Sequence, residues 1–498
     1  MFPRLFARLF GHPPNLLARV RYPGGMTTAT VVGSGPNGLA AAIVLAEAGV
    51  SVTVIEARDT IGGGTRTAEL TAPGVLHDVC SAAHPFAAAA PFFRQRDFFQ
   101  SEGMQLVQPE KAVAHPLDDG SAGYLAQALD ESSPVQGADA QRWRKLFEPL
   151  VESFADLSED VLRPLPAIPK HPVLFARFGA LAGLSGQRLA KLFDTPQTQA
   201  LIAGNAAHVI RPLNRPATAS VAMMLTTAAH AVGWPVPVGG SQAIAQAMAD
   251  RLTSLGGSIE TGRRVVDVAD LDTDIVMLDI SPAAVLEMYG DRLPNRVSFW
   301  YRRWKDGPAA WKIDLAIEGD IPWTSPVCRQ AGTVHVGGSL TQVMHAEQQI
   351  HDGVMPDRPF VLVGQQYMAD PSRSQGSTNP IWMYAHVPTG FAGDASDAIL
   401  NHVEHFAPGF RDRILQMVVT TPAGLQEYNP NYRQGDILTG ANSLRQLVLR
   451  PRPARNPYHL GIDGHYLCSA ATPPGAGVHG MCGQFAAEAA LAASRSGG

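Results

Sequence analysis

A glycine-rich turn near the start of the chain limits the possible folds more than any other feature. Residues 31–38, Val-Val-Gly-Ser-Gly-Pro-Asn-Gly, follow β-branched residues and precede a helix-forming run over 39–48 that Gly49 stops. Gly33 allows a tight turn, Gly35 lets the backbone approach a phosphate, and Gly38 lets the helix pack closely on the strand. The pattern predicts a βαβ unit whose helix amides face the phosphates of a dinucleotide.

The second strand of this unit, over 52–55, ends at Glu56. This acid lies about twenty residues beyond the glycines, the spacing at which a carboxylate accepts hydrogen bonds from ribose hydroxyls. A carboxylate there disfavours a 2′-phosphate, so the pattern argues against an NADP-type ligand. The alternative is a glycine-rich turn in an ordinary α/β protein, but strand, turn, helix and acid together favour the dinucleotide site.

A second glycine loop, Ile61-Gly62-Gly63-Gly64-Thr65-Arg66, follows almost directly. This order of acid, spacer, glycines and arginine resembles the flavoproteins that bind FAD. The loop offers further backbone amides, and Arg66 offers a guanidinium, close to the pyrophosphate; for Arg66 the alternative is a surface charge. The predicted FAD contacts in this part of the chain are Gly33, Gly35, Pro36, Asn37, Gly38, Glu56, Ala57, Arg58, Gly63, Gly64, Thr65 and Arg66.

Near the other end, residues 466–483 read as a strand and a small-residue loop, followed by a helical run over 484–494. They resemble the C-terminal FAD signature of phytoene desaturase-like flavoproteins, and Pro-Pro-Gly-Ala-Gly-Val-His-Gly over 473–480 resembles the branch of pyridine nucleotide-disulfide oxidoreductase domain-containing protein 2. The likeness extends over 77–85, 370–373 and 450–453. It implies that the loop passes beside the flavin ring, and the contacts it implies are Gly477, Val478, His479 and Met481, with Val265 and Ala471 completing the predicted cofactor site.

The chain departs from this family pattern in two places. Many relatives carry an acid where this chain has Ser469-Ala470, so a carboxylate contact to the ribityl or pyrophosphate region is missing. Relatives also fit a small β-meander between the strands near 262–268 and 275–278, where this chain has only a few polar residues.

The alternation of segments predicts the domain organisation. A chain of 498 residues with 45% hydrophobic residues is long enough for two or more packed domains. We predict an α/β fold of the amine oxidase or phytoene desaturase kind. A discontinuous Rossmann-like FAD-binding domain, 27–95, 225–290 and 446–498, is interleaved with an α+β substrate domain, 96–224 and 291–445. The reactive site is expected at their junction.

Composition limits the partners. A formal charge of −5 argues against nucleic acid as a main partner. The four cysteines form no CxxC pair, which argues against structural zinc or any other metal site and against a redox disulfide, and suits a reducing, cytoplasmic location. No run reaches the length of a membrane-spanning helix.

Two segments nevertheless carry basic charge without any acid. One is 161–193, where apolar residues recur at helical spacing, and the other is the extension 1–26. For the first, a core-packed helix pair with a solvated basic face is weighed against a hydrophobic portal resting on a membrane. For the second, a transit peptide or surface anchor is weighed against a native start at Met26, which is preferred.

These features predict an FAD-dependent oxidoreductase. No second dinucleotide unit is visible, so we expect the flavin N5 to take a hydride from a small apolar, isoprenoid- or lipid-like substrate, with oxygen or a quinone as the electron acceptor. His479 is the first catalytic candidate, with a structural role as its alternative. Lys312 is a weaker candidate, because amine oxidase relatives place a lysine on a substrate-domain strand. The competing functions are an amine oxidase-like enzyme and an interaction protein with structural FAD.

Overall fold

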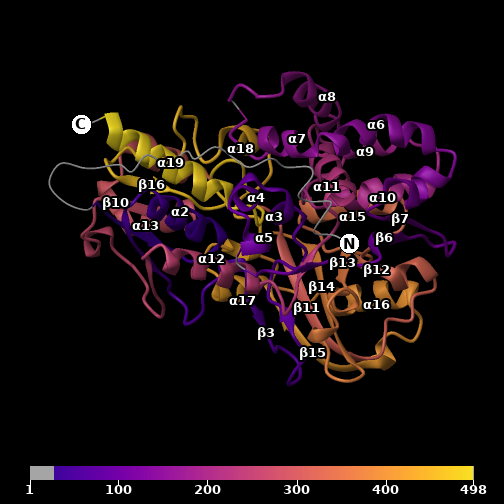
Figure 1. The fold of residues 1–498 in the computed structure, drawn as a ribbon. Coiled ribbons are helices and arrows are strands. Elements are labelled where there is room, and N and C mark those ends of the chain that lie inside the picture. Colours follow the sequence, from indigo (N-terminus) through magenta and orange to yellow (C-terminus); the bar gives the residue numbers. More distant parts are fainter. Residues whose placement is uncertain (1–26, 102, 166, 497–498) are drawn as a thin grey trace.

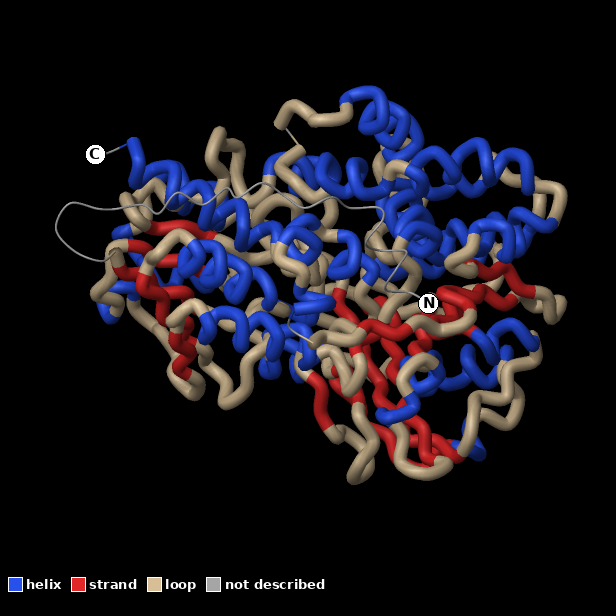
Figure 2. Tube along the Cα trace, viewed as in Figure 1, coloured by secondary structure: helices blue, strands red, loops and turns tan. Residues whose placement is uncertain are grey.

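The computed structural model describes residues 27–101, 103–165 and 167–496, so the predicted basic extension over 1–26 lies outside the described residues. Two sheets organise the described part, and Figure 2 shows them in separate halves of the molecule, with helices around each. The predicted fold class, a Rossmann-like α/β unit interleaved with an α+β unit, is confirmed.

The smaller sheet contains the predicted βαβ unit. Its strands run parallel in the order β16-β10-β1-β2-β9. They are β1 (Thr28–Val32), β2 (Ser51–Ile55), β9 (Ser258–Glu260), β10 (Ile275–Leu278) and β16 (His465–Leu467). The strand order reverses at β1, between β2 on one side and β10 on the other. In such sheets a ligand binds at the carboxyl ends of the strands on either side of this point.

Helices cover both faces of this sheet because its strands are apolar on both sides. One face carries α2 (Pro36–Glu47), α12 (Gln242–Ser254) and α19 (Met481–Ser496). The other carries α13 (Pro282–Tyr289) and α14 (Asn295–Tyr301). Ala48 ends α2, and Gly49 follows with φ +88°, as the sequence predicted. Residues 261–274 between β9 and β10 contain no strand, in agreement with the predicted loss of the meander.

The larger sheet has seven strands in the order β15-β11-β14-β13-β12-β6-β7. They are β6 (Lys111–Pro116), β7 (Ala122–Leu125), β11 (Ala309–Glu318), β12 (Ala331–Val336), β13 (Val361–Gly364), β14 (Thr378–Val387) and β15 (Ile414–Thr420). One face packs on α16 (Ser396–Phe406) through Ile399 and Val403. The opposite face packs on α10 (Pro196–Ala207) and α15 (Leu340–His351).

A helical layer completes the second half (Figure 1). It consists of α6 (Ala140–Glu152), α7 (Phe154–Val161), α8 (Pro172–Ala182), α9 (Gly186–Ala190), α10 and α11 (Ala219–Ala231). Its core contains Trp143 and Phe147. Short elements join the two halves: α3 (Pro85–Ala89), α4 (Pro91–Gln95), α5 (Phe98–Ser101), α17 (Pro422–Tyr428), α18 (Leu444–Leu449), β3 (Thr67–Ala68), β4 (His77–Asp78), β5 (Leu106–Val107) and β8 (Val236–Pro237).

Two predicted boundaries differ from the structure. The boundary between 224 and 225 falls inside α11, which packs along its length on the helical layer, so 225–231 belong with that layer. The boundary at 290 is too early, because Val297 and Tyr301 of α14 pack on the smaller sheet. Both errors arise because helix packing, which sequence periodicity does not assign to a partner, decides where these segments belong.

Candidate functional site

One cavity of about 1020 Å³ connects the two halves of the molecule. It begins at the glycine turn after β1 and continues between α8, α11 and α18. Most predicted site residues line it, namely Gly33, Gly35, Pro36, Asn37, Glu56, Ala57, Arg58, Gly63, Gly64, Thr65, Arg66, Val265, Gly477, Val478 and His479. Gly38, Ala471, Met481 and Lys312 are not part of this lining.

The glycine turn has the geometry that a bound phosphate requires. Gly33 adopts φ +102°, a conformation that residues with a side chain rarely adopt. Gly35 caps α2 without any side-chain hydrogen bond. Pro36 has no N–H and the Gly38 amide donates to Asp279, so in the first turn the Asn37 amide is left for a ligand. Asn37 also lines the cavity, and its buried Oδ1 has no partner in the described structure.

Asp279, which the sequence analysis missed, lies beneath this turn. Its Oδ2 accepts a hydrogen bond from the Gly38 amide at 3.0 Å. Burial, and secondarily the charge of Glu56, raise the pKa of the Asp279 carboxyl to about 7. Its position directly after the apolar strand β10, at the carboxyl edge of a parallel sheet, was a signal that could have identified it.

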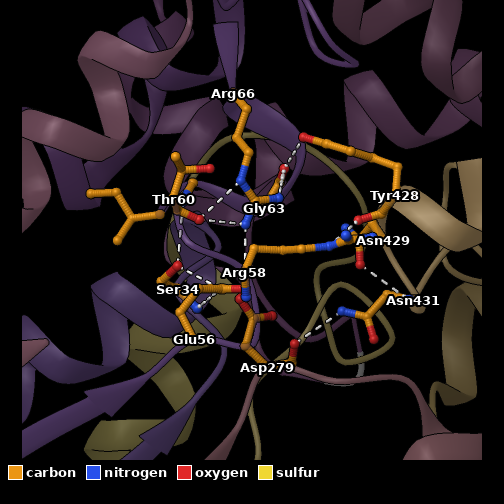
Figure 3. Close-up of polar contacts among 12 residues, drawn as sticks. Ser34, Glu56, Arg58, Thr60, Gly63, Arg66, Asp279, Tyr428, Asn429 and Asn431 are labelled. Carbon is orange, nitrogen blue, oxygen red and sulfur yellow. Dashed lines mark hydrogen bonds and ion pairs between the residues drawn. The ribbon is translucent and has the colours of Figure 1, made fainter. Parts of the chain in front are cut away.

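Glu56 is held in place by its neighbours (Figure 3). Its Oε2 accepts hydrogen bonds from the Ser34 amide at 3.0 Å and the Ser34 hydroxyl at 2.6 Å, and Oε1 accepts from the Arg58 amide at 2.9 Å. Arg66 Nη2 lies 3.3 Å from Glu56 Oε1. These contacts fix the carboxylate at the end of β2, where the βαβ pattern places a ribose.

Arg66 is a buried group that organises the second glycine loop. It is 7% exposed, so the alternative of a surface charge is wrong. Its guanidinium donates to the carbonyls of Thr60, at 2.7 and 3.0 Å, and Gly63, at 3.0 Å (Figure 3). Arg66 therefore holds this loop in shape as well as contributing positive charge to the cavity wall.

The end of α17 and the residues after it contact the second glycine loop and Asp279. The Tyr428 hydroxyl donates to the Gly63 carbonyl at 2.6 Å, and Asn431 Nδ2 donates to the Asp279 carbonyl at 3.0 Å (Figure 3). Tyr428, Asn429 and Asn431 also line the cavity. Sequence reasoning missed this segment, because no local pattern shows which distant loop it contacts.

The C-terminal loop holds His479 by its own backbone. His479 Nδ1 accepts from the Met481 amide at 3.0 Å, and Nε2 lies 3.1 Å from the Gly475 carbonyl. Both nitrogens are therefore satisfied, and burial lowers the pKa of this histidine to about 4. These contacts favour the structural alternative for His479. Ala471 and Met481 pack in the two cores beside the smaller sheet.

Lys312 lies on β11 as predicted, but it is 3% exposed and is paired with Asp314. Asp314 Oδ1 is also 3.6 Å from His77 Nδ1, and burial raises the pKa of Asp314 to about 6. The ammonium therefore belongs to a buried charged cluster rather than to the cavity lining, which argues against the catalytic role considered for Lys312.

The far part of the cavity is mainly apolar. Its lining there includes Phe86, Phe175, Phe178, Met224, Leu225, Leu438, Leu447 and Val448. In the basic segment 161–193, Phe178 packs in the core and Phe175 lines the cavity, whereas Ile168 and Val173 are 88% and 84% exposed. The segment thus has the core-packed face of one prediction and an exposed apolar surface as well.

Comparison with known proteins agrees with this geometry. A family model described as "NAD(P)-binding Rossmann-like domain" matches residues 31–100. Pyridine nucleotide-disulfide oxidoreductase domain-containing protein 2 of Rattus norvegicus is 24% identical, with 92% of each chain covered. Phytoene desaturase (neurosporene-forming) of Rhodobacter capsulatus is also 24% identical, with 92% of each chain covered. The chain is a homologue of these oxidoreductases.

The solved structures show the same fold. A putrescine oxidase has a TM-score of 0.57 at 16% identity, covering 94% of this chain and 99% of the other. At that identity the likeness shows the fold alone, which is of the amine oxidase and phytoene desaturase kind. The predicted oxidoreductase class is confirmed by the homologues. In the described part of the chain, no helix is both long and apolar enough to cross a membrane.

Proposed function

We propose that this protein is an FAD-dependent oxidoreductase that dehydrogenates an apolar, lipid- or isoprenoid-like substrate. The observation that carries this proposal is one continuous cavity, which runs from a dinucleotide-type glycine turn to an apolar chamber between α8, α11 and α18. A cofactor and an apolar molecule would thus share one enclosed space, as hydride transfer between them requires.

The residues present fit FAD. Glu56 is oriented for ribose hydroxyls, and Asn37 Oδ1 is a buried acceptor without a partner in the described structure. The amides of Asn37, Gly63 and Gly64 have no partner among the described residues and can bind a pyrophosphate. Beyond the residues that would contact an adenosine diphosphate, the lining continues to Gly477 and Val478. This length supports a longer cofactor than an adenosine diphosphate alone. When bound, the flavin supplies a hydride acceptor at N5, and oxygen or a quinone would reoxidise it.

The chain's own contribution is to bind, orient and exclude water. Phe175, Phe178 and Met224 form an apolar wall that would hold a hydrocarbon segment. Buried Arg66 and the helix terminus supply fixed positive charge at the dinucleotide end. These tasks need no titrating side chain.

Anaerobic reduction of the flavin tests this function. Protein reconstituted with FAD would be mixed with a series of apolar alkenes, terpenes and lipids while the visible flavin absorbance is followed. We expect bleaching with at least one of them, and readmission of oxygen or addition of a quinone identifies the acceptor. A flavin that no substrate in any class reduces would support the competing idea of structural FAD.

One observation favours a second candidate, an amine oxidase-like enzyme. Tyr384 lies opposite Lys312 in the β11–β14 register, and Tyr384 and Trp382 both line the cavity with ring centroids 5.1 Å apart. Aromatic residues near Lys312 are the feature expected of that class. Hydrogen peroxide and aldehyde formation from primary amines, with no reaction of neutral lipids, would select this candidate.

The exposed apolar residues near α8 support a peripheral membrane contact. Leu165 and Leu444 line the cavity and are also 42% and 53% exposed, so they lie where the cavity reaches the surface. Ile168 and Val173 are exposed in the same basic segment. We propose that an apolar substrate enters here from a lipid surface.

A further inference from the structure

A buried arginine interrupts the apolar part of the cavity. Arg450 lines the cavity directly after α18 and is only 3% exposed. Its Nε donates to the Gln446 carbonyl at 3.0 Å, Nη1 to the Ala470 carbonyl at 3.1 Å, and Nη2 to Asn442 Oδ1 at 3.2 Å. All three partners are neutral, and a guanidinium has five N–H donors, so donors remain for a ligand.

No carboxylate among the described residues forms an ion pair with Arg450. Asp436 acts on it only through space, because its oxygens accept from the amides of Gly307, Leu438 and Gly440. Burial disfavours the charged form of Arg450 and lowers the pKa of its guanidinium. Buried charges are normally paired, so the environment of Arg450 is incomplete without an anion.

The other cations of the cavity lie elsewhere and have other tasks. Arg66 faces Glu56, and Arg58 donates to the Tyr428 carbonyl at the end of α17, both at the dinucleotide end. Arg163 pairs with Asp160, Arg263 pairs with Glu260, and Arg264 is exposed. The carboxylates in the described lining, Glu56, Asp279 and Glu287, also lie on the elements of the smaller sheet. Arg450 has none of these carboxylates as a partner. It follows α18, whose Leu447 and Val448 line the apolar part of the cavity, and it also contacts the C-terminal loop through the Ala470 carbonyl.

His208 is a second polar group of the lining, and Asn442 links its neighbour Val209 to Arg450. Asn442, which accepts from Arg450, donates through Nδ2 to the Val209 carbonyl at 3.2 Å, next to His208 at the end of α10. His208 lines the cavity, its Nε2 is 3.0 Å from His335 Nε2, and no described residue bonds its Nδ1. Burial lowers the pKa of His208 to about 3, so the imidazole is neutral. With His335 as the donor in the contact between the two Nε2 atoms, His208 can donate one hydrogen bond from Nδ1.

We infer that Arg450 and His208 bind the carboxylate of the substrate, which is therefore a lipid-like acid rather than a pure hydrocarbon. A guanidinium matches a carboxylate in planar geometry, and the hydrocarbon part would lie against Phe175, Phe178 and Leu447. The inference rests on the proposed function, because it names the substrate class of the same cavity.

Binding to the FAD-loaded protein tests the inference without any turnover. Palmitate and hexadecanol share one chain and differ in the head group, and both can displace a fluorescent fatty acid. We expect wild type to bind palmitate at least about tenfold more tightly than hexadecanol. Arg450→Met should remove that preference, Arg450→Lys should keep part of it, and His208→Phe should reduce it.

Three control measurements distinguish a role of Arg450 in substrate binding from a role in cofactor binding or in folding. Flavin content, reduction potential and thermal unfolding would be measured for each variant. An unchanged palmitate preference in Arg450→Met overturns the inference. If that variant instead loses FAD or shifts its potential, the guanidinium serves the cofactor. If Arg450→Met does not fold, the ratio of palmitate to hexadecanol affinity in Arg450→Lys and His208→Phe tests the inference instead. Tight palmitate binding with no flavin reduction by any substrate would contradict the proposed function but not the inference about the carboxylate site.

Discussion

The Asp279 carboxylate accepts a hydrogen bond from the Gly38 amide at 3.0 Å, directly beneath the turn that would bind a pyrophosphate. A carboxylate is an unusual neighbour for a phosphate, because two like charges repel in a buried site. Its pKa of about 7 means that the group can be neutral under ordinary conditions. The site therefore combines a phosphate-binding turn with a carboxyl group whose charge depends on pH.

The first prediction concerns this pH dependence. The pKa of Asp279 rises from 3.8 to about 7 on folding, so the folded chain holds a proton that the unfolded chain releases. The contribution of this bound proton to stability is fully present below pH 3.8 and is lost as the pH rises toward 7. We expect the free energy of unfolding of FAD-free protein to fall by up to a few kcal/mol across this range. Asp279→Asn should flatten this profile in urea titrations.

The same residue should affect cofactor affinity. FAD binding to wild type should weaken as the pH rises through 7, whereas Asp279→Asn should bind with little pH dependence, because an amide cannot ionise. Fluorescence titration of the FAD-free protein measures both affinities. A wild-type affinity that is constant across this range would show that the carboxyl does not sense the phosphate.

The second prediction tests the glycine turn. A Cβ at Gly35 would lie 2.5 Å from Asp279 Oδ2, and larger atoms would extend into the cavity. Gly35→Val is therefore expected to fold without retaining FAD and to be colourless. Gly179→Ala is the matched control, because Gly179 lines the same cavity but a Cβ there meets nothing within 4 Å. Full flavin absorbance in Gly35→Val would refute the cofactor assignment.

The third prediction separates the two roles considered for His479. Both of its nitrogens contact the backbone of residues 475–481, so His479→Ala should loosen this loop and weaken FAD retention by about tenfold or more. The catalytic alternative expects normal FAD content with slow substrate-driven reduction. Flavin content after gel filtration, measured together with the reduction rate, distinguishes the two outcomes.

The fourth prediction concerns the buried pair of Lys312 and Asp314. Lys312→Met leaves Asp314 without its charge partner in a fully buried site, which typically costs about 3–5 kcal/mol of stability. Lys312→Met combined with Asp314→Leu should recover much of that loss. Chemical denaturation of the two variants and of wild type checks this. A single variant as stable as wild type would make Lys312 a functional candidate again.

The fifth prediction tests the membrane contact. Arg177, Arg188 and Lys191 are exposed, so reversing all three to Glu should reduce sedimentation with anionic liposomes without changing bound FAD. Ile168→Ser with Val173→Ser should reduce binding to neutral liposomes as well, because both side chains are exposed. Equal sedimentation of wild type and variants would leave only the core-packed interpretation of this segment.

Local patterns carried most of the information about the dinucleotide half. Gly33, Gly35 and Glu56 act through neighbours within one βαβ unit, so spacing alone predicted their common location. The sequence could not show that Lys312 faces Asp314 rather than the cavity, since strand patterns do not reveal what packs above a face. Tyr428 and Arg450 were missed as site residues for a related reason: each acts through contacts across the fold.

The pairing of β16 with β10 and the packing of α19 on α2 have a consequence for biogenesis. A Cβ at Gly483 would overlap the Asn37 carbonyl, so α19 fits closely against α2. The nucleotide half therefore combines the earliest described strand with the latest one. During synthesis the apolar edge of this half at β10 stays uncovered until residues 465–496 have emerged from the ribosome. A chain truncated before residue 465 would expose that edge to chaperones and proteases, and loading of the cofactor would follow translation instead of accompanying it.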